Sequence, residues 1–180
     1  YNSANTLEET LSSIVSQTYP DIEIIIIDSS SKDTTIDIAK KFGARIFNAD
    51  SLALARKTGV DNSAGKYIFM VDSDQSLEND TVEQCVRACE EDGFDAVTLF
   101  EVSKITNNTF AEQVIAYDKW LFHSLGDDDP VHGTAIPRFF KAEFMKRVDF
   151  LNNPPITFEH SMIHNEIVKM GARVKFINSH

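Results

Sequence analysis

The sequence has few cysteines and few basic residues, and both shortages narrow what the protein can be. Its two cysteines, Cys85 and Cys89, lie four apart in a helix-like stretch and fit small apolar core positions. They suggest neither a disulfide framework nor a zinc knuckle, so we expect a reducing compartment. The 17 Lys and Arg are outnumbered by 28 Asp and Glu, which gives a net charge of −11. This argues against sequence-independent binding of nucleic acid or of an anionic membrane, because both need clustered basic side chains.

Long apolar runs are also absent. No stretch approaches the roughly 18 consecutive apolar residues of a membrane-spanning helix, and no signal peptide is visible. The 180 residues, 42% of them hydrophobic, match one globular domain with a real core. The chain opens on Tyr1 rather than Met, so we expect the natural protein to carry further sequence.

Helical and strand-like segments alternate along the first hundred residues. Apolar, β-branched runs predict strands at 22–28, 44–47, 66–72 and 95–102, and helical spacing predicts helices at about 7–15, 33–42, 51–63 and 80–92. Short loops join them. This order predicts an α/β fold, a doubly wound and mostly parallel sheet with helices on both faces.

The alternation weakens after about residue 103. Helices are predicted at 109–125, 142–148 and 159–170, short strands at 134–140 and 173–177, and a polar loop at 126–133. We interpret this half as an elaboration of the same domain.

Carboxylates stand at the ends of two predicted strands. Asp28 closes one apolar run, and Asp72 and Asp74 close another. Ligands of open α/β sheets bind at the carboxyl ends of strands. Two carboxylates about 4 Å apart repel by about 4 kcal/mol at an effective dielectric of about 20, so both stay ionised only beside a cation. Oxygen ligands favour Mg²⁺ or Mn²⁺, which points to a nucleoside diphosphate as the further ligand. Alternatively, Asp72 caps the next turn and Ser73 and Asp74 are ordinary loop residues.

Several ordered motifs in residues 1–100 resemble family 2 of the inverting nucleotide-sugar glycosyltransferases, which have the GT-A fold. Tyr1-Asn2 matches the end of the family's P-T-Y-N, QTYP at 17–20 ends a helix as in the family, and DSSSKDTT at 28–35 matches its strand-to-loop motif. The stretch 52–74 is similar to the family's A-R-N-x-G and D-x-D segments. The resemblance implies one GT-A domain over 1–180, with a nucleotide-sugar-binding half to about residue 102 and an acceptor-side half from about residue 103.

The resemblance implies roles for residues of the donor half. Asp28 would contact the base or ribose of the nucleotide, and the loop carrying Ser30 and Asp33 would lie beside it. Arg56 would lie near the base or the diphosphate. Asp33 is equally suited to cap the helix that follows, and Arg56 to be a solvated helix residue.

The D-x-D segment would hold the donor's phosphates. Asp72 and Ser73 would contact the nucleotide sugar, and Asp72 and Asp74 would bracket Mg²⁺ or Mn²⁺, with mostly the second Asp touching the metal. Arg138, after a short strand, would reach the leaving diphosphate or serve as a surface residue.

The catalytic base departs from the family pattern. The family places an acidic pair at the start of a late helix, and here that position reads Glu159-His160. The expected Asp is replaced by His160, whose imidazole, with an unperturbed pKa of about 6.5, still suits a general base. Glu159 and His160 are equally good candidates for the catalytic base. The third possibility is that the base has been lost.

The implied activity is metal-assisted transfer of a sugar from a nucleoside-diphosphate sugar to an acceptor hydroxyl, with inversion, by a hexosyltransferase-like enzyme of glycan or cell-envelope biosynthesis. The acceptor would be a glycan, a lipid-linked molecule or another hydroxyl compound. We expect a cytoplasmic protein, or one at the cytoplasmic face of a membrane through segments outside this sequence. The alternatives are a nucleotide-sugar-binding module without transfer activity and a nucleotidyltransferase.

The resemblance also implies a strand before Tyr1. The family's first strand precedes P-T-Y-N and lies centrally in the sheet. Without it, the strands at 22–28 and 66–72 would each lack a neighbour and expose unpaired backbone.

Overall fold

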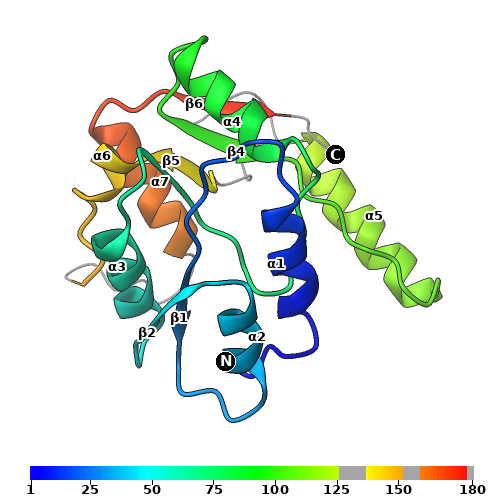
Figure 1. Ribbon diagram of the computed structural model, residues 1–180. Coiled ribbons are helices and arrows are strands. Elements are labelled where there is room, and N and C mark those ends of the chain that lie inside the picture. Colours follow the sequence, from blue (N-terminus) through cyan, green and yellow to red (C-terminus); the bar gives the residue numbers. More distant parts are fainter. Residues whose placement is uncertain (126–136, 152–158, 178–180) are drawn as a thin grey trace.

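The computed structural model describes residues 1–125, 137–151 and 159–177, and each predicted helix and strand has a counterpart there (Figure 1). The helices are α1 (Leu7–Val15), α2 (Thr35–Lys41), α3 (Leu52–Asn62), α4 (Thr81–Glu90), α5 (Phe110–Leu125), α6 (Ala142–Met145) and α7 (Glu159–Lys169). The strands are β1 (Ile25–Asp28), β2 (Arg45–Asn48), β3 (Tyr67–Phe69), β4 (Ala96–Leu99), β5 (Phe139–Lys141) and β6 (Val174–Ile177). The polar loop predicted at 126–133 lies outside the described residues.

The strands form two sheets. β1 and β2 pair in parallel, and the other sheet has the order β3-β5-β4-β6. In that sheet β4 and β6 are parallel, whereas β5 runs antiparallel to both β3 and β4. The α/β fold with parallel strand pairs is therefore as predicted, and β5 is inserted between β3 and β4 in the opposite direction.

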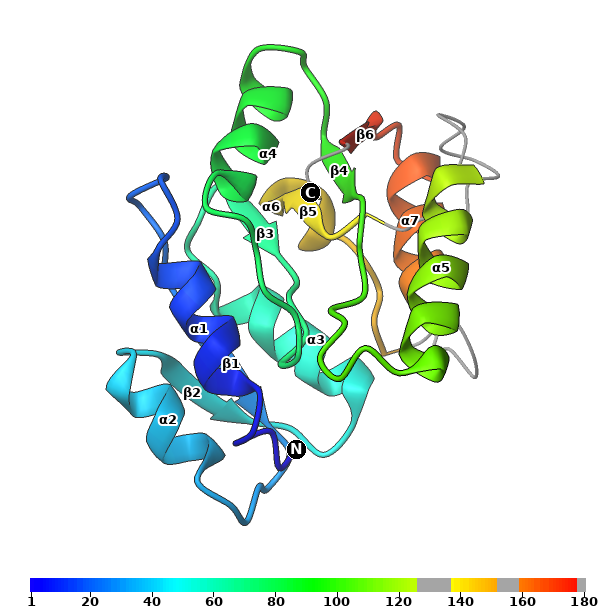
Figure 2. The same cartoon turned by 90° about the vertical axis from the view of Figure 1, so that its right-hand side faces the viewer.

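Helices cover both faces of the four-stranded sheet, as predicted (Figure 2). On one face Ala96 and Phe140 pack against side chains of α3, α6 and α7, including Met145 and Ile167. On the other face Val97 and Phe139 pack against α4. The neighbours Ala96 and Val97 are both fully buried on opposite faces, because side chains alternate along a strand. Cys85 and Cys89 of α4 are free thiols in this second core, as the sequence predicts.

A third core lies under the smaller sheet. Leu7 and Leu11 of α1 pack with Ile38 and Ala39 of α2 against the apolar side chains of β1 and β2. The chain then leaves α2 through Gly43, whose φ of 70° is a conformation that favours glycine.

The edges of β1 and β3 that lack a partner border one cavity of about 920 Å³. Within the described chain, β1 pairs only with β2, and β3 only with β5. Most of the cavity wall is apolar and runs along both strands, from Ile24 to Ile27 and from Tyr67 to Met70. A strand before Tyr1, lying between these edges, stays a prediction.

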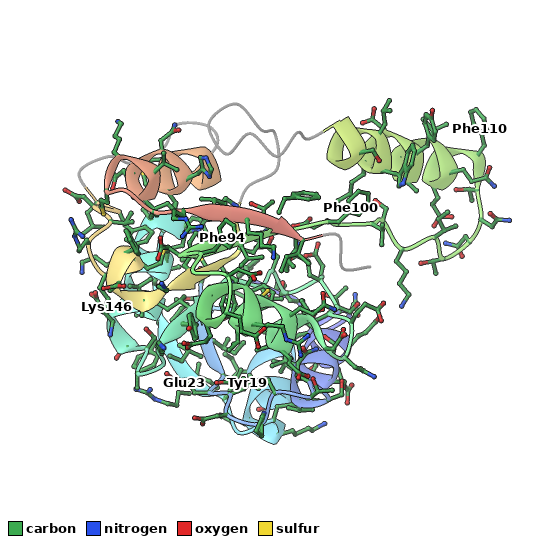
Figure 3. The ribbon with its side chains drawn as sticks, turned by 90° about the horizontal axis from the view of Figure 1, so that it is seen from above. Tyr19, Glu23, Phe94, Phe100, Phe110 and Lys146 are labelled. Atoms are coloured by element: carbon green, nitrogen blue, oxygen red, sulfur yellow. The ribbon has the colours of Figure 1, made fainter. Side chains whose placement is uncertain are left out.

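Helix α5 extends beyond the rest of the molecule (Figure 3). The sequence predicts Phe110, Val114, Tyr117 and Leu121 on one side, and the structure exposes the first three of them. Lys119 instead faces the body and contacts Glu101. No helix within the described ranges has the length and apolar content to cross a membrane.

Candidate functional site

The end of β1 holds a buried carboxylate. Asp28 is the last residue of β1 and only 4% exposed. Its Oδ2 accepts a hydrogen bond of 2.7 Å from the Ser31 N–H, and its Oδ1 accepts one from the Ser31 hydroxyl. Ser30, with a φ of 64°, turns the chain back so that these bonds can form. Asp28 is thus fixed at the rim of the cavity rather than free in solvent.

The N-terminal segment joins this turn to the loop that follows β3. The Asn2 N–H donates to Ser31 Oγ at 2.8 Å, and the Ser3 N–H donates to Thr35 Oγ1 at 2.8 Å. The Ser3 hydroxyl lies 2.8 Å from that of Ser73. The motifs around Asp28 and Ser73, which lie far apart in the sequence, therefore meet at one place.

Asp33 serves the local structure. Its Oδ1 accepts from the N–H and hydroxyl of Thr35, and its Oδ2 accepts from the Ala4 N–H. The Thr35 hydroxyl bond and these backbone donors together outweigh a smaller opposing desolvation effect and hold the pKa of Asp33 below its usual range. The N-cap of α2 is Thr34, one residue later than predicted, although Asp33 still binds the first amide of the helix. A donor contact by Asp33 stays a prediction.

The loop that carries Asp72 and Asp74 (residues 70–75, hereafter the acidic loop) begins earlier than predicted. β3 ends at Phe69 rather than Asp72, and Met70 adds one more backbone bond, to the Arg138 carbonyl at 2.9 Å. Gln75 then closes a turn, because its side chain accepts from the Asp72 N–H and its N–H donates to the Asp72 carbonyl. The Asp72 side chain is 52% exposed at the rim of the cavity. Asp74 is exposed two residues further on.

Arg138 is not a surface residue, since its side chain is 14% exposed. Its Nη1 donates to Asp72 Oδ2 at 2.8 Å and its Nε donates to Glu101 Oε1 at 3.1 Å. Lys119 of α5 binds the second Glu101 oxygen at 3.1 Å. Burial raises the pKa of Glu101, but Arg138 and Lys119 outweigh burial and hold that pKa below its usual range. Neither Glu101 nor Lys119 was expected from the sequence; the one signal was a carboxylate near the end of the strand predicted at 95–102.

Arg56 lies on α3, half-buried, and lines the same cavity as Asp28 and Asp72. Ser51 N-caps this helix by accepting from the Leu54 N–H at 3.2 Å, which fixes where the helix starts. The structure therefore brings Arg56, Asp28, Asp72 and Arg138 to one cavity, although Asp74 is not in its wall.

Glu159 and His160 are the first two residues of α7, as the sequence predicts. His164, one turn later, is buried in the molecule, and burial lowers its pKa. His164 is therefore suited to core packing rather than to proton transfer at the surface.

Metal binding by Asp72 and Asp74 stays a prediction. No group of three or more His, Cys, Asp or Glu in the described part of the chain could hold a metal. A pair of carboxylates is nevertheless what Mg²⁺ commonly takes from a protein, since its other ligands are phosphate oxygens and water. The donor set therefore suits an ion carried by a diphosphate.

The chain belongs to glycosyl transferase family 2, whose family model matches residues 1–169. It is 23% identical over 202 residues to the cholesterol galactosyltransferase of Borreliella burgdorferi, a match that covers 100% of this chain and 56% of that protein. The chain thus spans little more than half the length of this relative.

Two solved structures share the fold. Staphylococcus aureus TarS 1-349 has a TM-score of 0.71 and 16% identity, covering 100% of this chain and 56% of that one. Glucosyl-3-phosphoglycerate synthase from Mycobacterium tuberculosis, in complex with Mn²⁺, UDP and glucosyl-3-phosphoglycerate, has a TM-score of 0.61 and 17% identity, covering 98% and 66%. With the family match, these likenesses identify the chain as a glycosyltransferase with the GT-A fold, as the sequence motifs predict.

Proposed function

We propose that this domain transfers a sugar from a nucleoside-diphosphate sugar to an acceptor hydroxyl, with inversion and with the help of Mg²⁺ or Mn²⁺. The observation that carries the proposal is the meeting of Asp28, Ser73 and Asp72 at one rim. The hydrogen bonds of Asn2 and Ser3 join these two loops. Strand ends of open α/β sheets are where nucleotides bind.

The polar rim suits a nucleotide. Asp28 would accept hydrogen bonds from the base or ribose, with Ser30 and Asp33 in the adjoining loop and Arg56 near the base or diphosphate. We assign the nucleotide only to the polar rim, and not to the apolar part of the cavity along β1 and β3. UDP is the first nucleotide to test, because the mycobacterial synthase was solved with it.

The acidic loop suits the donor's phosphates. Asp72 and Asp74 would hold the divalent ion, which, when bound, supplies positive charge to the departing diphosphate. Arg138 is already aimed at Asp72 and brings a fixed guanidinium to the same phosphates. Ser73 adds a hydroxyl beside them.

The proton of the acceptor hydroxyl would go to Glu159 or His160 at the start of α7. The acceptor oxygen then attacks the anomeric carbon from the face opposite the leaving diphosphate, so that one C–O bond forms as the other breaks. The acceptor would be a glycan, a lipid-linked molecule or another hydroxyl compound, and the whole protein would act in glycan or cell-envelope biosynthesis. The two free thiols fit the cytoplasm or the cytoplasmic face of a membrane.

A donor hydrolysis assay with the full-length protein tests this function. With Mn²⁺ and a panel of nucleotide sugars, we expect slow release of the nucleoside diphosphate from one donor. Release of pyrophosphate would identify a nucleotidyltransferase instead. Binding without any release, and without transfer to any acceptor tried, would favour a binding module.

A further inference from the structure

Four charged side chains form a continuous row from the acidic loop to α5. Asp72 binds Arg138 at 2.8 Å, Arg138 binds Glu101 at 3.1 Å, and Glu101 binds Lys119 at 3.1 Å. The two central side chains are the most buried, with Arg138 14% and Glu101 23% exposed. Shielding from water makes these inner contacts stronger than ordinary surface pairs.

The backbone of Arg138 is fixed by its neighbours, so only its side chain can turn. Its N–H donates to the Val97 carbonyl at 3.0 Å, and its carbonyl accepts from the Met70 N–H at 2.9 Å. Glu101 takes the Nε of the guanidinium, which leaves Nη1 to point at Asp72. Without Glu101, the guanidinium could rotate about its long side chain and meet Asp72 in other ways.

We propose that Glu101 is a positioning residue of the donor site, acting through Arg138 on the charge and geometry at Asp72. The inference rests on the proposed function, because it assumes that Asp72 and Asp74 receive a divalent ion with the donor. Glu101 touches neither donor nor acceptor in this role. It keeps the Nε edge of the guanidinium occupied, so that Arg138 meets Asp72 through Nη1 at Oδ2 and leaves the other carboxylate oxygen for the ion.

The charges in this row predict the direction in which each variant changes cation binding. Asp72 and Glu101 carry two negative charges, and Arg138 and Lys119 carry two positive ones, so the row is neutral. The charge of Asp74 is then left over to attract a cation. Neutralising Glu101 leaves one extra positive charge beside Asp72, which opposes cation binding. Neutralising Lys119 leaves one extra negative charge, which does not.

The test is a Mn²⁺ titration of the folded, full-length protein at saturating UDP, followed by the electron paramagnetic resonance signal of free Mn²⁺. Glu101→Gln should raise the Kd for Mn²⁺ roughly fivefold or more. Lys119→Gln should leave that Kd within about twofold of the wild type, or lower it. Glu101→Asp, which keeps the charge but shortens the reach, should give a Kd between those of Glu101→Gln and the wild type.

The matched control is Asp95→Asn. Asp95 pairs with Lys141 at 2.7 Å, with 15% and 23% exposure, so its ion pair is as buried as that of Glu101 but lies at the other end of β4. It should lower the melting temperature and leave the Kd for Mn²⁺ unchanged. A Kd shift as large in Asp95→Asn as in Glu101→Gln would overturn the proposal.

The remaining outcomes separate this proposal from the proposed function. Wild-type protein that binds no Mn²⁺ with UDP overturns both. Wild-type binding with an unshifted Kd in Glu101→Gln overturns the role of Glu101 alone. If Glu101→Gln does not fold, Glu101→Asp decides, because an unshifted Kd in that variant contradicts the need for the full side-chain reach.

Discussion

The hydroxyls of Ser3 and Ser73 lie 2.8 Å apart although 70 residues separate them in the sequence. Ser3 is also tied through its N–H to Thr35, and Ser73 stands between Asp72 and Asp74. This contact joins the turn after β1 to the loop after β3, the two segments that we propose hold the nucleotide and its phosphates.

Removal of that contact should weaken donor binding more than folding. Ser3→Ala removes one hydrogen bond that water would replace in the unfolded chain, so we expect the free energy of unfolding to fall by about 0.5–1.5 kcal/mol. The KM for the donor should rise several-fold while kcat stays close to the wild type. Steady-state kinetics and urea unfolding measure the two effects.

The control for this prediction is a double-mutant cycle with Ser73→Ala. If the two hydroxyls act together, the effects of the single variants on KM will not add. Additive effects would show that Ser3 and Ser73 act separately.

The ion pair of Asp95 and Lys141 predicts how stability depends on pH. Burial raises the pKa of Asp95, but the Arg173 N–H and the Lys141 ammonium outweigh it and hold the pKa below its usual value. The stabilisation is therefore full above the unfolded pKa of about 3.9 and is lost as pH falls through the lower folded pKa. Asp95→Asn should cost about 1–3 kcal/mol near neutral pH, and this difference should shrink in strong acid.

Urea unfolding of Asp95→Asn and the wild type, from strong acid to neutral pH, measures this difference in the free energy of unfolding. Asp92→Asn is the control, because its pair with Lys175 is more exposed and should contribute little at any pH. If Asp95→Asn destabilises the protein equally in acid and near neutral pH, the charge of Asp95 does not stabilise the folded state.

The identity of the base can be decided by a pH profile of kcat/KM. If His160 is the base, activity falls below about pH 6.5 and His160→Ala removes that limb. If Glu159 is the base, the limb lies near the carboxyl pKa of about 4.3 and Glu159→Gln removes it. The responsible variant should lose roughly a hundredfold or more in kcat. Full activity in both variants would place the base elsewhere.

The fold could be predicted from the sequence where local pattern decides it. The helix predicted at 33–42 ends at Lys41, and α7 begins at Glu159 as the sequence predicts. The length of the strands could not be predicted. A strand ends where its ladder partner ends, and β3 keeps only the partner Phe139–Lys141, which itself is three residues long.

The candidate site divides in the same way. Asp28, Asp72 and Arg56 could be found because each belongs to a local motif. Glu101 and Lys119 could not, because their contacts depend on β5 entering between β3 and β4 in the antiparallel direction. That insertion places Arg138 next to a residue 37 positions away, and no local pattern marks it.

Metal-assisted donor binding is tested most directly by the Mn²⁺ dependence of UDP binding in Asp74→Asn, measured by calorimetry beside Asp61→Asn. Asp61 is an exposed carboxylate on α3 paired only with Lys57 among the described contacts, so its loss should leave binding unchanged. We expect Mn²⁺ to tighten UDP binding in the wild type and in Asp61→Asn, and we expect Asp74→Asn to lose this effect. Undiminished Mn²⁺-dependent binding in Asp74→Asn would contradict this expectation.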